Sequence, residues 1–302
     1  EDYVIKMKAL GMNTLKLFTT YSDSDRRTYD KEIIELLELS KKYHFLIMAH
    51  IENDDLIRLD PKFTYKDLTV SRPSKSELTE ALKLAEYTRQ TKGYMYMVHL
   101  SSGKTLEALI QNYPDILNQH FFVESCPQYF TFTEEDLKRK DGYLYTFAPP
   151  LRSEKEKELL FKYHESVYTI GTDHCAFMKK DKIKPTLSQM PLGIGGIEHA
   201  LGIMRYHLGD EAIEKMTKRV AFTQGLHSKG QIKEGLDADI TIFKADKGMR
   251  VQGKHGTCDY SVYENLPTAG KVITTLVRGQ FVLKNGILMK HKGQLIKGSD
   301  FL

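Results

Sequence analysis

Four residues of metal-ligand or titratable type stand near the ends of apolar, β-rich runs of this chain. Lys16 lies in TLKLFTTY, His50 in IMAHIEN, His99 in YMVHLSS and Asp173 in IGTDHC. Neutral imidazoles and a carboxylate are ligands that Zn²⁺ accepts, and a zinc ion with an open coordination position is hydrolytic. The residue types therefore predict a metal-dependent hydrolase.

Each of these residues also has an ordinary structural interpretation. A single histidine at a strand end is more often a hydrogen-bonded core residue than a ligand, and an aspartate before a helix is more often a cap. The metal prediction depends on all four residues falling at equivalent positions of successive strands. Eight of the nine other histidines are interpreted as structural, because they do not share that placement or, for His174, because strand alternation turns it to the opposite face from Asp173. They are His44, His164, His174, His199, His207, His227, His255 and His291.

Lys16 is the least expected of the four, because it lies in a run that resembles a buried strand. Burying a charged ammonium without a partner costs several kcal/mol. Such a lysine is expected to face solvent, to be paired, or to be chemically altered. Tyr21, five residues further on, has two interpretations: a packing aromatic, or a phenol that reaches into the mouth of a site.

The four residues are placed by alternating strands and helices, as hydrophobic periodicity predicts. The predicted strands span residues 14–20, 45–51, 94–100, 121–125 and 167–171. Helices are predicted at 31–43, 75–90, 104–112 and 154–164, followed by 197–208 and 211–221. Strand, helix, strand at this rhythm indicates a parallel sheet, whose reactive groups gather at the carboxyl ends of the strands.

Two of the helices begin with the spacing of a capping box, Ser74 with Glu77 and Ser153 with Glu156. Five strand–helix units are too few to close an eight-stranded barrel and would also suit an open, doubly wound sheet. Periodicity alone does not decide between these α/β folds.

After about residue 225 the pattern changes to short β-rich runs. They cover 237–243, 271–277 and 280–288, and Asn285-Gly286 is a strong tight-turn signal. We therefore predict two parts, an α/β body over residues 1–225 and a β module with a tail over residues 226–302.

Composition excludes several classes of function. The net charge of +4 over 302 residues is too dilute to indicate a nucleic-acid partner. Three widely spaced cysteines favour a reducing compartment, and no apolar run is long enough to span a bilayer. These features predict a cytoplasmic protein without a membrane partner. The chain opens on Glu1 inside a helix-like segment, so we expect the protein to begin before this sequence does.

The motifs of the chain resemble the dihydropyrimidinase/hydantoinase family of the cyclic-amide amidohydrolase superfamily. The matching stretches, in family order, are LKLFTTY, AHIEN, VHLSSGKTLEAL, ESCPQYFTFTEEDL, APPLRSEKEKELL, GTDHCAF, PLGIGGIEHAL, GLDADITIF and CDYSVYENL. The resemblance implies a (β/α)₈ TIM barrel with a side β-sandwich. It also implies two divalent metal ions, usually zinc, bridged by a carboxylated lysine.

The resemblance implies a role for each candidate residue. His50 and His99 would hold one metal, the carboxylated Lys16 would bridge both, and Asp173 would bind the other. Asp173 would also act as general base toward a metal-bridging hydroxide, and Tyr21 would donate its O–H to the developing oxyanion. The implied reaction is the hydrolytic opening of a cyclic amide or ureide, a dihydropyrimidine or a 5-substituted hydantoin.

The resemblance is incomplete at its amino-terminal side. The first strand of family members ends in an HxH pair, and no HxH sequence occurs in these 302 residues. The match begins at about the fourth strand, so the chain is expected to be an incomplete barrel of strands 4 to 8 with part of the small sandwich. On this interpretation it is a truncated family member and is not expected to be a competent catalyst by itself.

Two positions implied to bind substrate depart from the common family pattern. Ala148 stands where many members have serine, and Leu192 where many have asparagine. Leu192 would make that wall more apolar, which favours a bulkier 5-substituted hydantoin over a dihydropyrimidine. Cys126 and Cys175 are interpreted as packing residues, since the implied hydrolysis uses a metal-activated water.

Three alternatives remain at this point. One is an allantoinase- or dihydroorotase-like cyclic amidase, and another is a non-catalytic scaffold like the dihydropyrimidinase-related proteins. The third, an open-sheet nucleotide-binding module, would require a glycine-rich loop after the first strand, where this chain has LFTTYSD. The resemblance also implies a homo-oligomer, a tetramer or a dimer.

Overall fold

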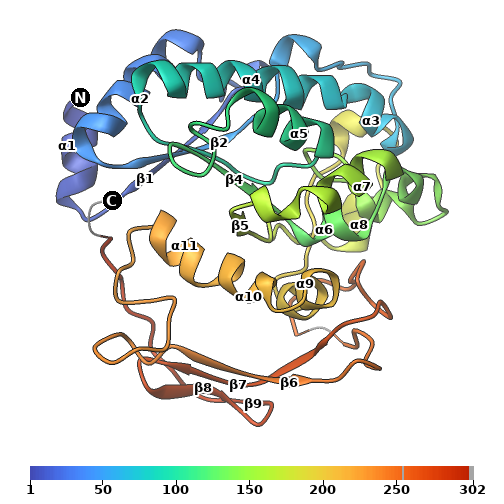
Figure 1. Ribbon diagram of the computed structural model, residues 1–302. Coiled ribbons are helices and arrows are strands. Elements are labelled where there is room, and N and C mark those ends of the chain that lie inside the picture. The colour runs from blue at the N-terminus through green and yellow to red at the C-terminus, as the bar shows by residue number, and fades with distance from the viewer. Residues whose placement is uncertain (254, 299–302) are drawn as a thin grey trace.

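The computed structural model describes residues 1–253 and 255–298, which fold around two sheets (Figure 1). The first sheet has five strands in the order β1-β2-β3-β4-β5. Its strands are β1 (Thr14–Phe18), β2 (Leu46–His50), β3 (Met95–Met97), β4 (Phe121–Ser125) and β5 (Thr169–Ile170). All four neighbouring pairs run parallel, which confirms the predicted parallel sheet. The order leaves β1 and β5 as the two edges, so the sheet is open.

Helices from the connecting segments cover the outer face of this sheet (Figure 1). They are α1 (Asp2–Ala9), α2 (Asp30–Tyr43), α4 (Ser74–Thr91), α5 (Gly103–Asn112) and α7 (Glu154–Lys162). Apolar side chains of these helices and of the strands form one large buried cluster. Gly103 lets α5 approach α7 closely, because a Cβ atom there would lie 2.1 Å from the Glu156 carbonyl oxygen. Any larger residue at position 103 would push the two helices apart.

Shorter helices build the rest of the body. They are α3 (Leu68–Ser71), α6 (Pro127–Thr131), α8 (Lys179–Lys182), α9 (Ala200–Leu208), α10 (Glu211–Met216) and α11 (Lys218–Thr223). Single 3₁₀ turns lie at Ser22–Ser24, Asp54–Leu56, Tyr65–Asp67, Glu134–Lys138, Gly142–Tyr145, His164–Ser166 and Leu187–Gln189. The single helix predicted over residues 211–221 is wrong. The chain breaks at Thr217, whose φ of −130° and ψ of −87° lie outside the helical region and separate α10 from α11.

One of the two predicted helix caps is confirmed and the other is wrong. Ser153 caps α7 by accepting a hydrogen bond from the Glu156 amide. Ser74 is instead the first residue of α4 and makes no cap, because its hydroxyl donates to the Glu156 carboxylate. The Glu77 carboxylate accepts from Ser101 rather than from its own helix. A contact distant in sequence has replaced the local one.

The second sheet is antiparallel, in the order β6-β7-β8-β9. Its strands are β6 (Ile240–Ala245), β7 (Gly270–Val277), β8 (Gln280–Lys284) and β9 (Ile287–Leu288). Asn285 and Gly286 form the predicted tight turn between β8 and β9, with φ of 49° and 81°. The run 280–288 is therefore two strands. The division of the chain at residue 225 stays a prediction.

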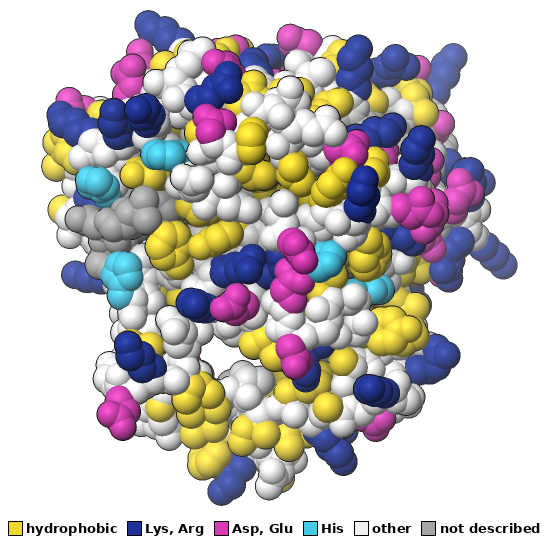
Figure 2. Space-filling model, viewed as in Figure 1, with side chains coloured by type: hydrophobic (Ala, Val, Ile, Leu, Met, Phe, Trp, Pro, Cys, Tyr) yellow, Lys and Arg dark blue, Asp and Glu magenta, His cyan; other side chains and the backbone are white. Residues whose placement is uncertain are grey.

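The antiparallel sheet exposes several apolar side chains to solvent. Figure 2 shows an opening between this sheet and the rest of the molecule, with hydrophobic side chains on the sheet. Exposed apolar residues of its strands are Ile242, Phe281, Ile287 and Leu288. Among the residues that the structure describes, no helix combines the length and the apolar character needed to cross a membrane.

Candidate functional site

All seven candidate residues named from the sequence line one pocket of about 310 Å³ at the carboxyl-terminal edge of the parallel sheet. They are Lys16, Tyr21, His50, His99, Ala148, Asp173 and Leu192. Phe18, Val98, Glu124 and Cys175 complete the lining. Lys16 and Asp173, 157 positions apart in sequence, meet here because parallel strands open onto one shared edge of the sheet.

Lys16 lies in the middle of β1, and its side chain is exposed in the pocket. Exposure is one of the three outcomes expected for a lysine in such a run. The ammonium donates to the Leu17 carbonyl at 3.1 Å and lies 3.8 Å from the centre of the Phe18 ring. The pocket walls desolvate the ammonium in part and lower its pKa to about 8, although Asp173 and Glu124 oppose the shift.

The two candidate histidines are buried and face each other. His50 ends β2, His99 follows β3 by two residues, and Nδ1 of His50 lies 3.0 Å from Nε2 of His99. Burial lowers the pKa of both imidazoles, so both are neutral at pH 7. Metal coordination requires neutral imidazoles.

Three candidate residues have a left-handed backbone conformation, which is uncommon for residues other than glycine. The φ angles are 74° for Tyr21, 44° for His99 and 46° for Asp173. Such conformations are costly and cluster at functional sites. Burial raises the pKa of the Asp173 carboxyl to about 6, and the Lys16 ammonium partly opposes this shift. The Tyr21 ring lies 5.4 Å from the His50 ring.

Ala148 and Leu192 lie on two loops that are joined behind the pocket. The Thr146 carbonyl accepts hydrogen bonds from the Gly193 amide at 3.0 Å and from the ammonium of Lys182. The same ammonium donates to the Thr146 hydroxyl at 2.9 Å. Lys182 is fully buried, and this burial lowers its pKa to about 7. The buried Lys182 side chain therefore binds the same carbonyl oxygen that links the two loops.

This burial predicts a pH dependence of stability. The unfolded chain binds the Lys182 proton up to a pKa of about 10.4, whereas the folded protein releases it near pH 7. Between these values the unfolded state holds more protons, so stability should rise with pH, by up to about 1.4 kcal/mol per pH unit. Denaturant unfolding of wild type and Lys182→Met from pH 6 to pH 10 measures this slope. The variant should lose it, and an equal slope in both proteins would contradict the assignment.

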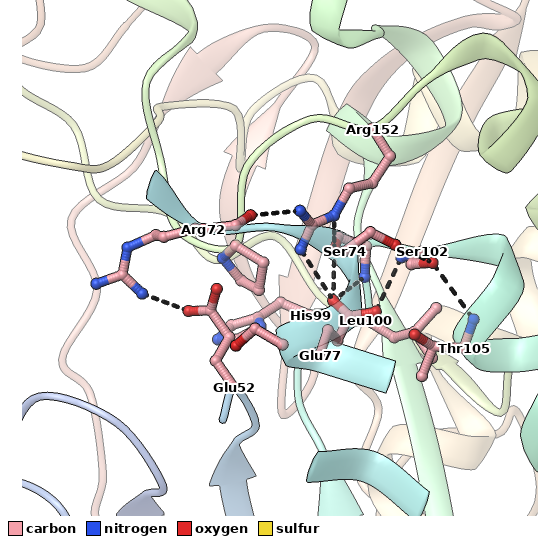
Figure 3. Close-up of polar contacts among 12 residues, drawn as sticks. Glu52, Arg72, Ser74, Glu77, His99, Leu100, Ser102, Thr105 and Arg152 are labelled. Carbon is pink, nitrogen blue, oxygen red and sulfur yellow. Dashed lines mark hydrogen bonds and ion pairs between the residues drawn. The ribbon is translucent and has the colours of Figure 1, made fainter. Parts of the chain in front are cut away.

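Two carboxylates at the site were missed in the sequence analysis. Glu52 is fully buried, and its Oε2 lies 2.7 Å from Nε2 of His50 (Figure 3 shows Glu52). Glu124 accepts hydrogen bonds from the Tyr96 hydroxyl at 2.8 Å and from the His99 amide at 3.1 Å. Burial raises its pKa to about 7. A charged residue inside an apolar strand, the signal that identified Lys16, is also present at Glu124.

The donor set fits a divalent metal on the histidine side of the pocket. Nδ1 of His50 and Nε2 of His99 face each other there. The other ring nitrogen of His50, Nε2, has the Glu52 carboxylate as its partner, and metal-ligating histidines usually have such a partner. Within residues 1–253 and 255–298, no three His, Cys, Asp or Glu side chains gather closely enough to hold a metal ion.

The structure also tests the residues that were set aside. Cys126 is fully buried, as predicted for a packing residue. Cys175 is exposed and lines the pocket, so its interpretation as a packing residue was wrong. Nδ1 of His174 accepts from the amides of Gly196 and Ile197 at 3.2 and 3.3 Å, which agrees with a structural role.

The chain is similar in sequence to known proteins of one family. The model of the amidohydrolase family matches residues 4–282. A D-hydantoinase of Rhizobium radiobacter is 28% identical over 303 residues, which cover 92% of this chain and 65% of that protein. A D-phenylhydantoinase of Escherichia coli O127:H6 is 27% identical over 318 residues, which cover 97% of this chain and 68% of that protein. The chain thus spans about two thirds of the length of these relatives.

Solved structures show the same fold. A D-hydantoinase crystal structure superimposes with a TM-score of 0.91 at 23% identity, over 99% of this chain and 70% of that one. A D-hydantoinase (dihydropyrimidinase) from Thermus sp. superimposes with a TM-score of 0.91 at 24% sequence identity. The superposition covers 100% of this chain and 70% of that one. The parallel sheet is accordingly five strands of an amidohydrolase TIM barrel, and the antiparallel sheet is part of the accompanying sandwich. By its sequence and its fold, the chain belongs to the amidohydrolase family, in the dihydropyrimidinase/hydantoinase branch.

Proposed function

We propose that this protein hydrolyses a cyclic amide or ureide, with a 5-substituted hydantoin or a dihydropyrimidine as substrate. The observation that carries the proposal is the convergence of Lys16, Tyr21, His50, His99 and Asp173 on one pocket. Relatives that align over most of this chain include a D-hydantoinase and a D-phenylhydantoinase. Members of this family depend on metal ions, which agrees with the donor types in the pocket.

The proposed cofactor is a pair of divalent metal ions, zinc in the first instance, with Lys16 carboxylated on Nζ. His50, His99 and the carbamate would hold one ion, and Asp173 and the carbamate the other. Only an unprotonated amine reacts with carbon dioxide, and a pKa of about 8 makes that form more abundant in Lys16 than in an ordinary lysine. When bound, the metals would supply a water activated near neutral pH and would polarise the ring carbonyl.

The side chains of the chain itself would move the protons. The Asp173 carboxylate, in the same pocket, would take a proton from the attacking water and return it to the ring nitrogen as the C–N bond breaks. The Tyr21 hydroxyl would donate a hydrogen bond to the carbonyl oxygen as negative charge develops there. Burial raises the pKa of Tyr21, which keeps this phenol protonated and able to donate.

Two features of the pocket favour a substrate with an apolar substituent. Leu192 and Ala148 form an apolar wall, and Phe18 adds an aromatic face. Apolar walls contribute affinity through burial of the substituent. We propose a 5-substituted hydantoin as the preferred substrate.

Ring-opening assays test the proposed function. Absorbance should be followed with dihydrouracil, hydantoin, 5-phenylhydantoin, allantoin and dihydroorotate, on the gene product that carries this chain and on residues 1–302 alone. The gene product should have its highest kcat/KM with 5-phenylhydantoin and should contain metal by elemental analysis. Residues 1–302, which have no HxH pair, are expected to be inactive. A preference for allantoin or dihydroorotate would overturn the substrate assignment, and a metal-free, inactive gene product would indicate a scaffold.

We also propose that the protein is cytoplasmic and forms a homo-oligomer, a dimer or a tetramer. The three widely spaced free cysteines support a reducing compartment. The exposed apolar residues of β8 and β9 support an additional contact surface. Light scattering coupled to size-exclusion chromatography measures the oligomeric state.

A further inference from the structure

Figure 3 shows two buried ion pairs near the candidate histidines. Glu52 pairs with Arg72, and Glu77 lies 3.9 Å from Arg152. All four residues are at most 6% exposed. A buried ion pair is weak evidence for stability, because desolvating two charges costs as much as their attraction returns. The position of the two ion pairs beside the candidate imidazoles therefore indicates a functional role rather than a contribution to stability.

The first pair acts on His50. Oε2 of Glu52 lies 2.7 Å from Nε2 of His50, and a carboxylate can only accept a hydrogen bond. Nε2 of His50 must then carry the proton, which leaves Nδ1 bare. That bare nitrogen is the one directed at Nε2 of His99, 3.0 Å away. Glu52 thereby selects both the tautomer and the ring orientation of His50.

Arg72 supports this arrangement from two sides. Its guanidinium donates to the same Oε2 of Glu52 and lies over the Tyr21 ring, 4.8 Å from its centre. The backbone of Glu52 is held independently by Thr19, whose hydroxyl accepts from the Glu52 amide at 3.0 Å. One arginine therefore contacts both the partner of His50 and the aromatic side chain proposed as oxyanion donor.

The second pair extends the connection to the turn that follows His99. Arg152 donates to the Arg72 carbonyl at 2.7 Å and to the Ser101 hydroxyl at 2.9 Å (Figure 3). The Glu77 carboxylate accepts the amides of Ser101 and Ser102, each at 3.0 Å. The two imidazoles are thus connected to one continuous set of buried contacts, which joins the segments after β2 and β3, the start of α4 and the segment before α7.

We propose that Glu52 and Arg72 are positioning residues that hold His50 as the Nε2–H tautomer with Nδ1 presented to the pocket, and that Arg72 also holds the Tyr21 ring. The statement that Nδ1 of His50 binds a metal ion rests on the proposed function. The tautomer itself does not, because it follows from the contacts of the protein without a bound ion. The two statements can therefore fail separately.

Histidine nitrogen NMR of the metal-free protein tests the positioning directly. In ¹⁵N-histidine-labelled wild type, His50 should give the pattern of a single Nε2–H tautomer. The double variant Glu52→Leu/Arg72→Met replaces the buried pair by apolar side chains of similar size, so it is expected to fold. Its His50 should show a substantial Nδ1–H population, because the acceptor at Nε2 is gone. Zn²⁺ titration against a competing chelator should show an affinity about 10- to 100-fold lower.

A second variant decides the outcome if the double variant does not fold. Glu52→Gln keeps the shape and removes the charge, so the Nε2–H proton resonance of His50 should move upfield as its hydrogen bond weakens. Glu156→Gln is the matched control, since its buried carboxylate contacts Ser74 and Ser102 but no imidazole. The control should leave the His50 resonances unchanged.

The results separate three situations. Altered His50 resonances in the Glu52 variants alone support the positioning role, even if the protein turns over no cyclic amide. Wild-type His50 resonances in every folded Glu52 variant overturn that role. Altered resonances in Glu156→Gln of the same size as in Glu52→Gln would also overturn it, because a general loosening of the fold would then explain both.

Discussion

Replacing Lys16 with alanine should remove most of the bound metal and lower turnover by about a thousandfold or more. The side chain lies in the pocket with His50, His99 and Asp173, and as a carbamate it would be the shared ligand of both ions. Metal activation supplies several kcal/mol of transition-state stabilisation, and each 1.4 kcal/mol lost lowers the rate tenfold. Elemental analysis and 5-phenylhydantoin hydrolysis by the gene product measure the two effects.

Lys16→Arg separates a carbamate from an ammonium role. Arginine keeps the positive charge but forms no carbamate, so this variant should be as inactive as Lys16→Ala. Lys41→Ala, on the exposed side of α2, is the control and should retain metal and turnover. Full metal content and activity in either Lys16 variant would refute the bridging role. Labelling with ¹³C-bicarbonate should add one carbamate carbon resonance in wild type that both Lys16 variants lack.

The second large effect is expected at Asp173. Asn at this position keeps an oxygen that can contact a metal but is a far weaker base than a carboxylate. The Asp173→Asn variant should therefore lose kcat by about 10²- to 10⁴-fold, the usual contribution of general acid–base catalysis. KM should change much less, because the apolar wall at Leu192 and Ala148 is untouched. Steady-state kinetics with 5-phenylhydantoin, together with metal analysis, distinguish loss of the base from loss of the ion.

The matched control for this variant is Asp181→Asn, which makes the same chemical change in α8, outside the pocket lining. It should keep the wild-type kcat. If Asp173→Asn turned over substrate at the wild-type rate with a full metal complement, another residue would have to be the base. Glu124, a second carboxyl in the same pocket, would then be the next residue to replace.

Much of the body could be predicted from sequence, because the signals involved are local. Short apolar, β-rich runs indicated the five strands, and the helical segments between them required parallel neighbours. The positions of His50, His99 and Asp173 followed from the same argument, since parallel strands end at one edge of a sheet. The resemblance then supplied the barrel as the closed form of that sheet, which periodicity could not distinguish from an open one.

Local patterns failed where distant groups competed for the same atoms. Ser74 and Glu77 have the spacing of a capping box, yet both side chains bond to the segment after His99 or to α7. The helix expected over 211–221 divides at Thr217, although its composition gives no break signal. For Ser74 and Glu77 the competing contacts lie far away in the chain, and a window of a few residues does not contain them.

By itself, the sequence determined the order of the strands along the chain and which of them bear histidine, lysine and aspartate in or just after the strand, because both depend on the hydrophobic pattern of neighbouring residues. Only the tertiary structure showed that Glu52, Arg72, Glu77 and Arg152 are buried near the candidate histidines. In the sequence these four look like ordinary surface charges. Whether a charge is buried depends on the partner that compensates it, and here Glu52 and Arg72 come from different turns of the fold, 20 residues apart.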